Sequence, residues 1–166
     1  MIKIGDSLPA LPLRILKNSI IEEVMLKDQI KGKKVILFAV PGAFTPTCSQ
    51  QHLPSFIHQA DAIKAHGIDE IYCVAVNDPY VLDIWRRVPH AEGKITLLSD
   101  GNGAFTKQMG LLLEGNPVLG LRSKRYVAIL DNGILIYLAV EPHPTDCSIT
   151  CAENFLKILD ENTHSK

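Results

Sequence analysis

The sequence lacks the features that would place it in several large functional classes. Its 166 residues carry a formal net charge of -1, so it has no strong basic or acidic balance of the kind that binds nucleic acid. No apolar run approaches the roughly 18 residues that a membrane-spanning helix needs. We therefore expect neither a nucleic-acid partner nor a membrane partner.

The chain also shows no targeting signal and no internal division. Met1 to Asp6 contain neither the apolar core of a secretory signal nor an arginine-rich amphipathic stretch. We expect a cytoplasmic location, or an organelle matrix if a presequence has been removed. No repeat, low-complexity segment or linker is present, so we expect residues 1–166 to form one domain.

Cysteine is scarce, and its spacing excludes one common redox site. The four cysteines are Cys48, Cys73, Cys147 and Cys151, and no two of them form a C-x-x-C pair. A thioredoxin-type dithiol is thereby excluded. In a chain of this size, rich in aliphatic residues, four cysteines are not needed as structural staples. Catalysis, redox chemistry and simple burial remain open for each of them.

Apolar periodicity predicts an α/β fold with a mixed sheet. Continuous apolar runs at 34–40 and 70–76 are typical of strands that are covered on both faces, and 50–66 between them predicts a helix. Asp131-Asn132-Gly133 predicts a hairpin turn. The other elements that we expect are strands at 95–98, 126–130 and 134–140, and helices at 80–87, at 102–109 and after a capping box at 150–153. This order is typical of thioredoxin-like folds.

The most informative segment is the loop Pro41-Gly42-Ala43-Phe44-Thr45-Pro46-Thr47-Cys48. It delivers Cys48 to the first turn of a helix, where free N–H groups and the helix dipole stabilise a thiolate. The hydroxyl of Thr45 can fold back toward that thiolate, while Pro41 and Pro46 stiffen the loop and limit the approach of water. A buried structural cysteine beside an N-capping threonine is the alternative interpretation of the same residues.

The loop also matches a family signature. Pro41, Thr45 and Cys48 fit the Pro-x-x-x-Thr-x-x-Cys pattern of peroxiredoxins, and residues 41–54 resemble the type II, or Prx5-type, subgroup. Further segments resemble that subgroup in order and spacing, namely 76–81 with Trp85, 98–101, 124–126 and 140–142. The resemblance implies a thioredoxin-like α/β fold, in which helices flank a mixed central sheet, with the additions typical of peroxiredoxins.

In chemical terms, the resemblance implies a thiol peroxidase of antioxidant defence. Such an enzyme reduces hydrogen peroxide and alkyl hydroperoxides through a sulfenic acid on Cys48, without metal, haem or flavin. Thr45 and the N–H groups around Cys48 would hold the peroxide oxygens, and Pro41 would shield the thiolate. Arg125 would be the fixed cation that favours the thiolate. We interpret His52 as a packing or hydrogen-bonding residue, and Arg86, Arg87, Arg122 and Lys124 as surface or interface charges.

The sequence leaves undecided which thiol reacts with the sulfenic acid of Cys48. Cys73 matches the place of a resolving cysteine in some members of the family. In others that place precedes the last helix and falls here at Ile149, flanked by Cys147 and Cys151. Direct attack by glutathione or glutaredoxin is the third alternative. The expected external reductant is accordingly glutaredoxin with glutathione, or thioredoxin.

A metal site at the last two cysteines is a further alternative that the spacing raises. His143, Cys147 and Cys151 lie four residues apart, which would place three ligands on one face of a helix. Pro144 and the capping box argue that this stretch is not helical. We therefore expect no metal.

The resemblance also implies a homodimer. Phe44 and the segments 111–113 and 119–121 offer apolar surface for such a contact, although their leucines are equally compatible with the core. A function of a different class also suits the same oxidisable thiol. A non-catalytic redox sensor or holdase would use it to change its assembly state, and would consume peroxide only once.

Overall fold

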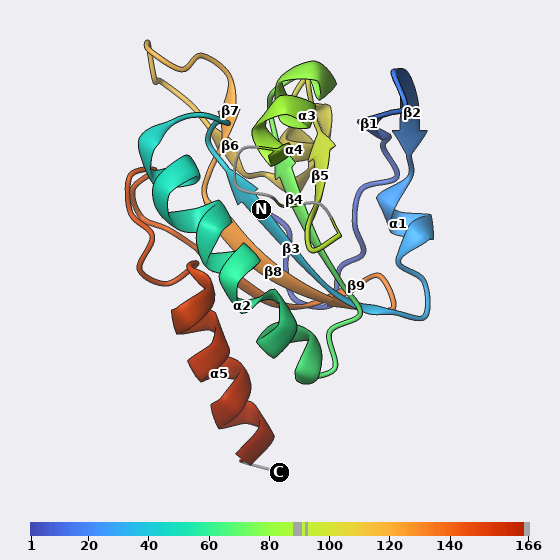
Figure 1. Cartoon of the computed structure of the whole chain (residues 1–166), viewed down its shortest axis with the longest axis vertical. Helices are drawn as coiled ribbons and strands as arrows, with labels where there is room; N and C mark the ends of the chain where they lie inside the picture. Colours follow the sequence, from blue (N-terminus) through green and yellow to red (C-terminus); the bar gives the residue numbers. More distant parts are fainter. Residues whose placement is uncertain (88–90, 92, 165–166) are drawn as a thin grey trace.

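The computed structural model describes residues 1–87, 91 and 93–164, and arranges them around a seven-stranded mixed sheet (Figure 1). The spatial order of the strands is β2-β1-β5-β4-β3-β8-β9. Neighbouring strands run parallel in the β3–β4 and β4–β5 pairs and antiparallel in the other pairs. The strands are β1 (Leu13–Lys17), β2 (Ile20–Val24), β3 (Lys34–Val40), β4 (Glu70–Ala75), β5 (Thr96–Ser99), β8 (Tyr126–Asp131) and β9 (Ile134–Val140).

Helices cover both faces of the sheet. On one face lie α2 (Leu53–Ala65), α3 (Pro79–Arg87) and α5 (Ala152–His164), which share a hydrophobic core with the sheet. On the other face lie α1 (Leu26–Gln29) and α4 (Ala104–Met109), which contribute to a second core. Three short elements complete the fold: a π-helix, η1 (Cys48–His52), and the paired strands β6 (Leu112–Leu113) and β7 (Arg122–Ser123).

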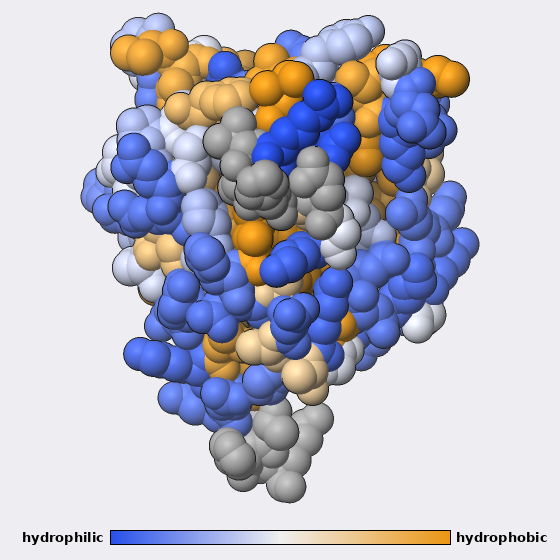
Figure 2. Space-filling model, viewed as in Figure 1, coloured by the Kyte–Doolittle hydropathy of each residue, from blue (hydrophilic) through white to orange (hydrophobic). Residues whose placement is uncertain are grey.

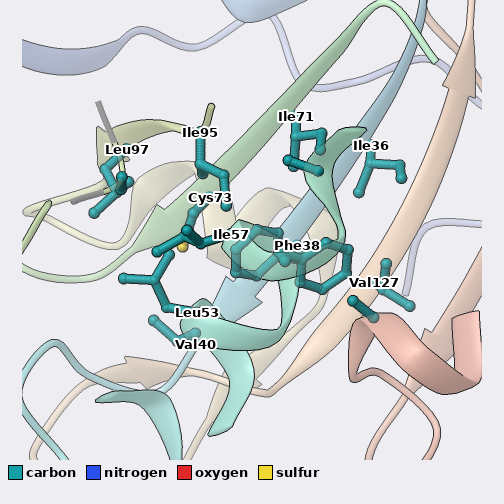
Figure 3. Packing of buried hydrophobic residues seen from close by; sticks show 14 of the residues in the cluster. Ile36, Phe38, Val40, Leu53, Ile57, Ile71, Cys73, Ile95, Leu97 and Val127 are labelled. Atoms are coloured by element: carbon teal, nitrogen blue, oxygen red, sulfur yellow. The ribbon is translucent and has the colours of Figure 1, made fainter. Parts of the chain in front are cut away.

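The continuous apolar runs are explained by burial on both faces, as the sequence predicts. In β3, Ile36, Phe38 and Val40 face the core under α2, whereas Val35, Leu37 and Ala39 face the core under α1 and α4. Figure 3 shows part of the first core, in which Phe38 and Val40 of β3 lie among side chains of α2 and β4. The predicted strands, the hairpin of β8 and β9, and the closing helix are confirmed, with shifts of one or two residues at their ends.

Pro54 predicts a bend or a short first turn in the helix expected at 50–66, and the helix is indeed divided there. η1 precedes α2, and Pro54 lies in the first turn of α2. The hairpin of β1 and β2 was not predicted. Its turn residues Asn18 and Ser19 adopt positive φ angles of 50° and 65°, and β2 is almost wholly exposed and lacks an apolar stripe.

The predicted capping box at 150–153 is wrong. The hydroxyl of Thr150 donates instead to Oε1 of Glu141 at 3.0 Å, and the N–H of Ala152 donates to Oγ of Ser55 at 3.0 Å. Oε1 of Glu141 also accepts the N–H groups of Ile149 and Thr150, at 2.7 and 2.9 Å. This buried carboxylate therefore fixes the segment that leads into α5.

Because α5 is attached to the sheet mainly through its apolar face, Phe155→Ala should lower the free energy of unfolding by about 3–5 kcal/mol. The Phe155 ring is buried, with its centroid 6.3 Å from that of Phe56 and 6.0 Å from that of Tyr137, so truncation leaves a cavity. Urea unfolding measures the loss. The control Ile20→Ala, at a site that is 64% exposed, should change stability by less than about 0.5 kcal/mol. Equal losses in the two variants would contradict this packing.

Candidate active site

Cys48 begins η1 and has no exposed surface. The loop that carries it leaves the end of β3 and is tied down on both sides. The N–H of Ala43 donates to Oδ1 of Asn77 at 2.9 Å, and the N–H of Ser49 donates to the Thr45 carbonyl at 2.9 Å. Between these ties Phe44 adopts a positive φ of 65°, which is unusual for an aromatic residue. The loop therefore holds a specific conformation around the cysteine.

Gly42 is needed in this loop because other atoms approach it closely. A Cβ at this position would lie 3.2 Å from Cγ2 of Thr45 and 3.6 Å from Nη1 of Arg122. Arg122, interpreted from the sequence as a surface or interface charge, has backbone partners beside this loop. Its guanidinium is partly buried, and donates to the carbonyls of Val76 at 2.8 Å and Leu119 at 2.9 Å. Arg122 thus joins the end of β4 to the segment before β7, beside the cysteine loop.

Arg125 is the cation that contacts the thiol. Its side chain is 1% exposed, and its Nη2 donates to Sγ of Cys48 at 3.1 Å. Nη2 and Nε also donate to the carbonyl of Pro144, at 3.0 and 3.2 Å, and Nη1 lies 2.9 Å from Nδ1 of His52. Of these three partners, the sulfur is the one that can carry a negative charge. The buried guanidinium thus places a positive charge and a hydrogen-bond donor directly on this sulfur.

His52 acts as a neutral acceptor for this cation. Its Nε2 lies 3.1 Å from the carbonyl of Thr150, which can only accept, so Nε2 carries the proton and Nδ1 accepts from Arg125. Burial, and after it the charge of Arg125, hold the pKa of His52 well below its usual 6.5. The interpretation of His52 as a hydrogen-bonding residue is confirmed.

Thr45 and Pro41 lie in the same loop as the cysteine. The hydroxyl of Thr45 donates to the carbonyl of Gly42 at 2.7 Å. Because its proton is used in this bond, Oγ1 of Thr45 presents lone pairs and can accept a hydrogen bond. Pro41 is buried at the end of β3.

The other three cysteines are in two different states. Cys73 in β4 is a free thiol that is 1% exposed, and Figure 3 shows it among apolar side chains of the core. Burial, and after it the neighbouring charge of Cys48, raise its pKa well above the usual value, although Arg125 opposes this. Cys147 and Cys151 are joined by a disulfide, with their Cα atoms 5.3 Å apart. Cys147 is therefore partly exposed but oxidised.

Two kinds of feature are absent from the described part of the chain. The described residues contain no group of three or more His, Cys, Asp or Glu side chains arranged to hold a metal ion. The two cysteines of the set His143, Cys147 and Cys151 bind each other. Within the same described ranges, no helix is both long and apolar enough to cross a membrane.

Several groups support the site in ways that the sequence did not indicate. Glu141 orders the segment before α5, the carbonyl of Pro144 accepts from Arg125, and Nε1 of Trp85 donates to Oγ of Ser49 at 2.9 Å. The sequence does contain a signal for Glu141, because an acidic residue between an apolar strand and a proline needs hydrogen-bond partners if it is buried. Backbone carbonyls such as that of Pro144 leave no signal in a sequence.

Comparisons with known proteins agree with this geometry. The model of the Redoxin family matches residues 3–156. Peroxiredoxin-2E, chloroplastic, of Arabidopsis thaliana is 43% identical over 163 residues, which cover 95% of this chain and 69% of that protein. Peroxiredoxin-2D of the same plant is 39% identical over 160 residues, covering 95% of this chain and 98% of the relative.

A solved structure extends the likeness to the fold. The crystal structure of reduced Prx3 from Vibrio vulnificus in complex with H₂O₂ is 43% identical in sequence and superposes with a TM-score of 0.92, over 99% of each chain. Its likeness confirms the thioredoxin-like fold, in which helices flank a mixed sheet. From these matches and from the loop that carries Cys48, the chain belongs to the peroxiredoxin family, in its type II subgroup.

Proposed function

We propose that Cys48 is the nucleophile with which this peroxiredoxin reduces peroxides. Peroxiredoxins are antioxidant thiol peroxidases, so the proposal concerns which residues carry the reaction and what restores them. The observation that carries it is the 3.1 Å bond from the buried guanidinium of Arg125 to Sγ of Cys48. This contact stabilises a thiolate at the start of η1, in a loop fixed by hydrogen bonds.

In the proposed step, the thiolate of Cys48 attacks one peroxide oxygen. An S–O bond forms while the O–O bond breaks, and the departing hydroxide or alkoxide takes up a proton. Oγ1 of Thr45 accepts a hydrogen bond from the peroxide, and Arg125 stabilises the negative charge that moves onto oxygen. Pro41 shields the thiolate from water. The sulfur supplies both electrons, so the proposed step uses no metal, haem or flavin.

The proposed substrates are hydrogen peroxide and alkyl hydroperoxides. A relative with 43% identity has been solved with H₂O₂ bound, which supports the first of these. The electrons that return the Cys48 sulfenic acid to the thiol come from glutaredoxin with glutathione, or from thioredoxin. As a resolving thiol Cys73 is disfavoured, because its burial opposes formation of the thiolate. The proposed location is the cytoplasm, or an organelle matrix if a presequence has been removed.

We also propose that the protein forms a homodimer through the end that carries the active site. Large apolar side chains are exposed there, with 52% of Phe44, 88% of Val118 and 51% of Leu121 accessible. Figure 2 shows apolar surface gathered at this end of the molecule, around the loop between β6 and β7. Leu111, expected as a possible contact residue, is instead fully buried in the core.

Replacement of the nucleophile gives the first test. Cys48→Ser should abolish peroxide consumption, because the serine hydroxyl is a far weaker nucleophile than a thiolate. Turnover of hydrogen peroxide and of an organic hydroperoxide is measured with glutathione plus glutaredoxin and, separately, with thioredoxin. Cys73→Ser is the control and should keep the peroxide step. Full activity of Cys48→Ser would refute the proposed nucleophile, and consumption of a single peroxide per wild-type chain would indicate a redox sensor.

A second test concerns the cation. Arg125→Ala should move the pH profile of Cys48 alkylation to higher pH and slow the peroxide step by about 10²–10³-fold, because a fixed donor to developing charge is lost. Arg125→Lys keeps the charge but not the planar set of donors, so it should recover the alkylation profile better than the rate. Arg14→Ala removes a cation of β1, which lies beside the edge strand β2, and should change neither. An unchanged alkylation profile in Arg125→Ala would contradict this role.

The neutral state of His52 predicts how stability depends on pH. Burial and Arg125 lower the pKa of His52 below 6.5. As the pH falls through 6.5, the unfolded chain therefore binds a proton at His52 while the folded chain does not. Stability should therefore fall as the pH drops below 6.5, at up to about 1.4 kcal/mol per pH unit from this residue. Urea unfolding between pH 7.5 and 5.5 measures this slope.

The matched controls for this slope are two glutamine variants. His52→Gln should flatten the fall in stability, whereas His58→Gln, which changes an exposed histidine of α2, should keep the wild-type slope. A wild-type slope in His52→Gln would show that His52 does not remain neutral on folding.

A further inference from the structure

The thiol that reacts with peroxide and the cysteines that face solvent are different residues. Cys48 has no exposed surface and Cys73 is 1% exposed, and both are free thiols. Cys147 and Cys151 are partly exposed and are already joined as a disulfide. An external protein reductant can therefore reach the Cys147–Cys151 pair directly, whereas it cannot reach a sulfur at the Cys48 position in this fold.

The segment that carries Cys147 is bonded to the immediate neighbours of Cys48. Nη2 of Arg125 donates both to Sγ of Cys48, at 3.1 Å, and to the carbonyl of Pro144, at 3.0 Å. The hydroxyl of Thr47 donates to the carbonyl of Thr145 at 3.0 Å. Thr47 precedes Cys48 in the chain, and Thr145 lies two residues before Cys147. The disulfide loop is thus packed against the active site on two sides.

The two sulfurs can meet after a local movement. Cys147 is the third residue after Pro144, and such a stretch spans at most about 10 Å when extended. His143, Thr145, Ser148 and Ile149 are exposed, so this loop can shift without opening the core. Cys48 lies in the first turn of a π-helix, whose hydrogen bonding is less stable than that of an α-helix.

We propose that Cys147 and Cys151 form a dithiol relay that restores Cys48, an inference that rests on the proposed role of Cys48 as the nucleophile. In the first step, the Cys147 thiolate attacks the sulfenic sulfur of Cys48. A Cys48–Cys147 disulfide forms, and the hydroxyl leaves as water with the thiol proton. In the second step, the Cys151 thiolate attacks Cys147 and releases Cys48 as a thiolate. The products are a free Cys48 and a Cys147–Cys151 disulfide, the state that the structure shows.

The relay ends at a surface that can receive the reductant. An open cavity of about 400 Å³ is lined by both relay cysteines and by Gln50, Gln51 and His58. A dithiol protein of the thioredoxin class attacks the disulfide there, supplying two electrons and leaving Cys147 and Cys151 as thiols. Cys48 therefore stays buried except during its exchange with Cys147.

The test oxidises the fully reduced chain with one equivalent of hydrogen peroxide, alkylates the remaining thiols and maps the products by mass spectrometry. Wild type should yield the Cys147–Cys151 disulfide with Cys48 alkylated. Cys151→Ser should accumulate the Cys48–Cys147 disulfide, because the second exchange is blocked. Cys147→Ser should leave a sulfenic acid on Cys48 that dimedone labels, and should lose turnover with thioredoxin.

Two controls separate the relay from other routes. Cys48→Ser should form no Cys147–Cys151 disulfide in the same time, so its formation there would overturn the relay in favour of direct oxidation. Cys73→Ser should give the wild-type products. The relay is also overturned if wild type retains the Cys48 sulfenic acid or forms Cys48–Cys73, with Cys147 and Cys151 alkylated. If Cys48 fails to react with peroxide at all, the proposed function itself fails, and this outcome is recognised by alkylated Cys48 in both Cys147→Ser and Cys151→Ser.

Discussion

The buried guanidinium of Arg125 is the constraint on which the rest of the site depends. Removing a cation from water costs several kcal/mol unless its donors are satisfied and a counter-charge lies nearby. The structure meets this need with the carbonyl of Pro144, with Nδ1 of His52 and with the sulfur of Cys48. The same need explains why His52 stays neutral, since a protonated imidazole would offer no acceptor and would add a second positive charge.

The segment between β9 and α5 supplies the backbone carbonyls that contact Arg125 and His52. Glu141 holds its second half through two N–H groups and a hydroxyl, which places the Thr150 carbonyl on His52. Its first half delivers the Pro144 carbonyl to Arg125, and the Cys147–Cys151 disulfide joins the two halves. Contacts therefore connect the disulfide-bearing segment to Arg125, and through Arg125 to Cys48.

The sequence was informative where burial or chemistry requires particular residues. Apolar runs identified β3 and β4 because both faces are buried, and the spacing of Pro41, Thr45 and Cys48 identified the loop. The hairpin of β1 and β2 escaped prediction because its outer strand is exposed and lacks an apolar period. The capping box failed because a distant carboxylate competed for the hydroxyl of Thr150. The Cys147–Cys151 disulfide and the role of Arg122 depend on tertiary contacts that no local pattern reports.

The central claim is that Arg125 and His52 act on Cys48 as one unit, and a double-mutant cycle tests it most directly. The rate of Cys48 oxidation is followed by the fluorescence of Trp85, the chain's single tryptophan, which donates to Ser49 beside Cys48. His52→Leu should slow oxidation when Arg125 is present and have no further effect in the Arg125→Ala background. If His52→Leu lowers the rate by the same factor in both backgrounds, the two residues act independently and the account is contradicted.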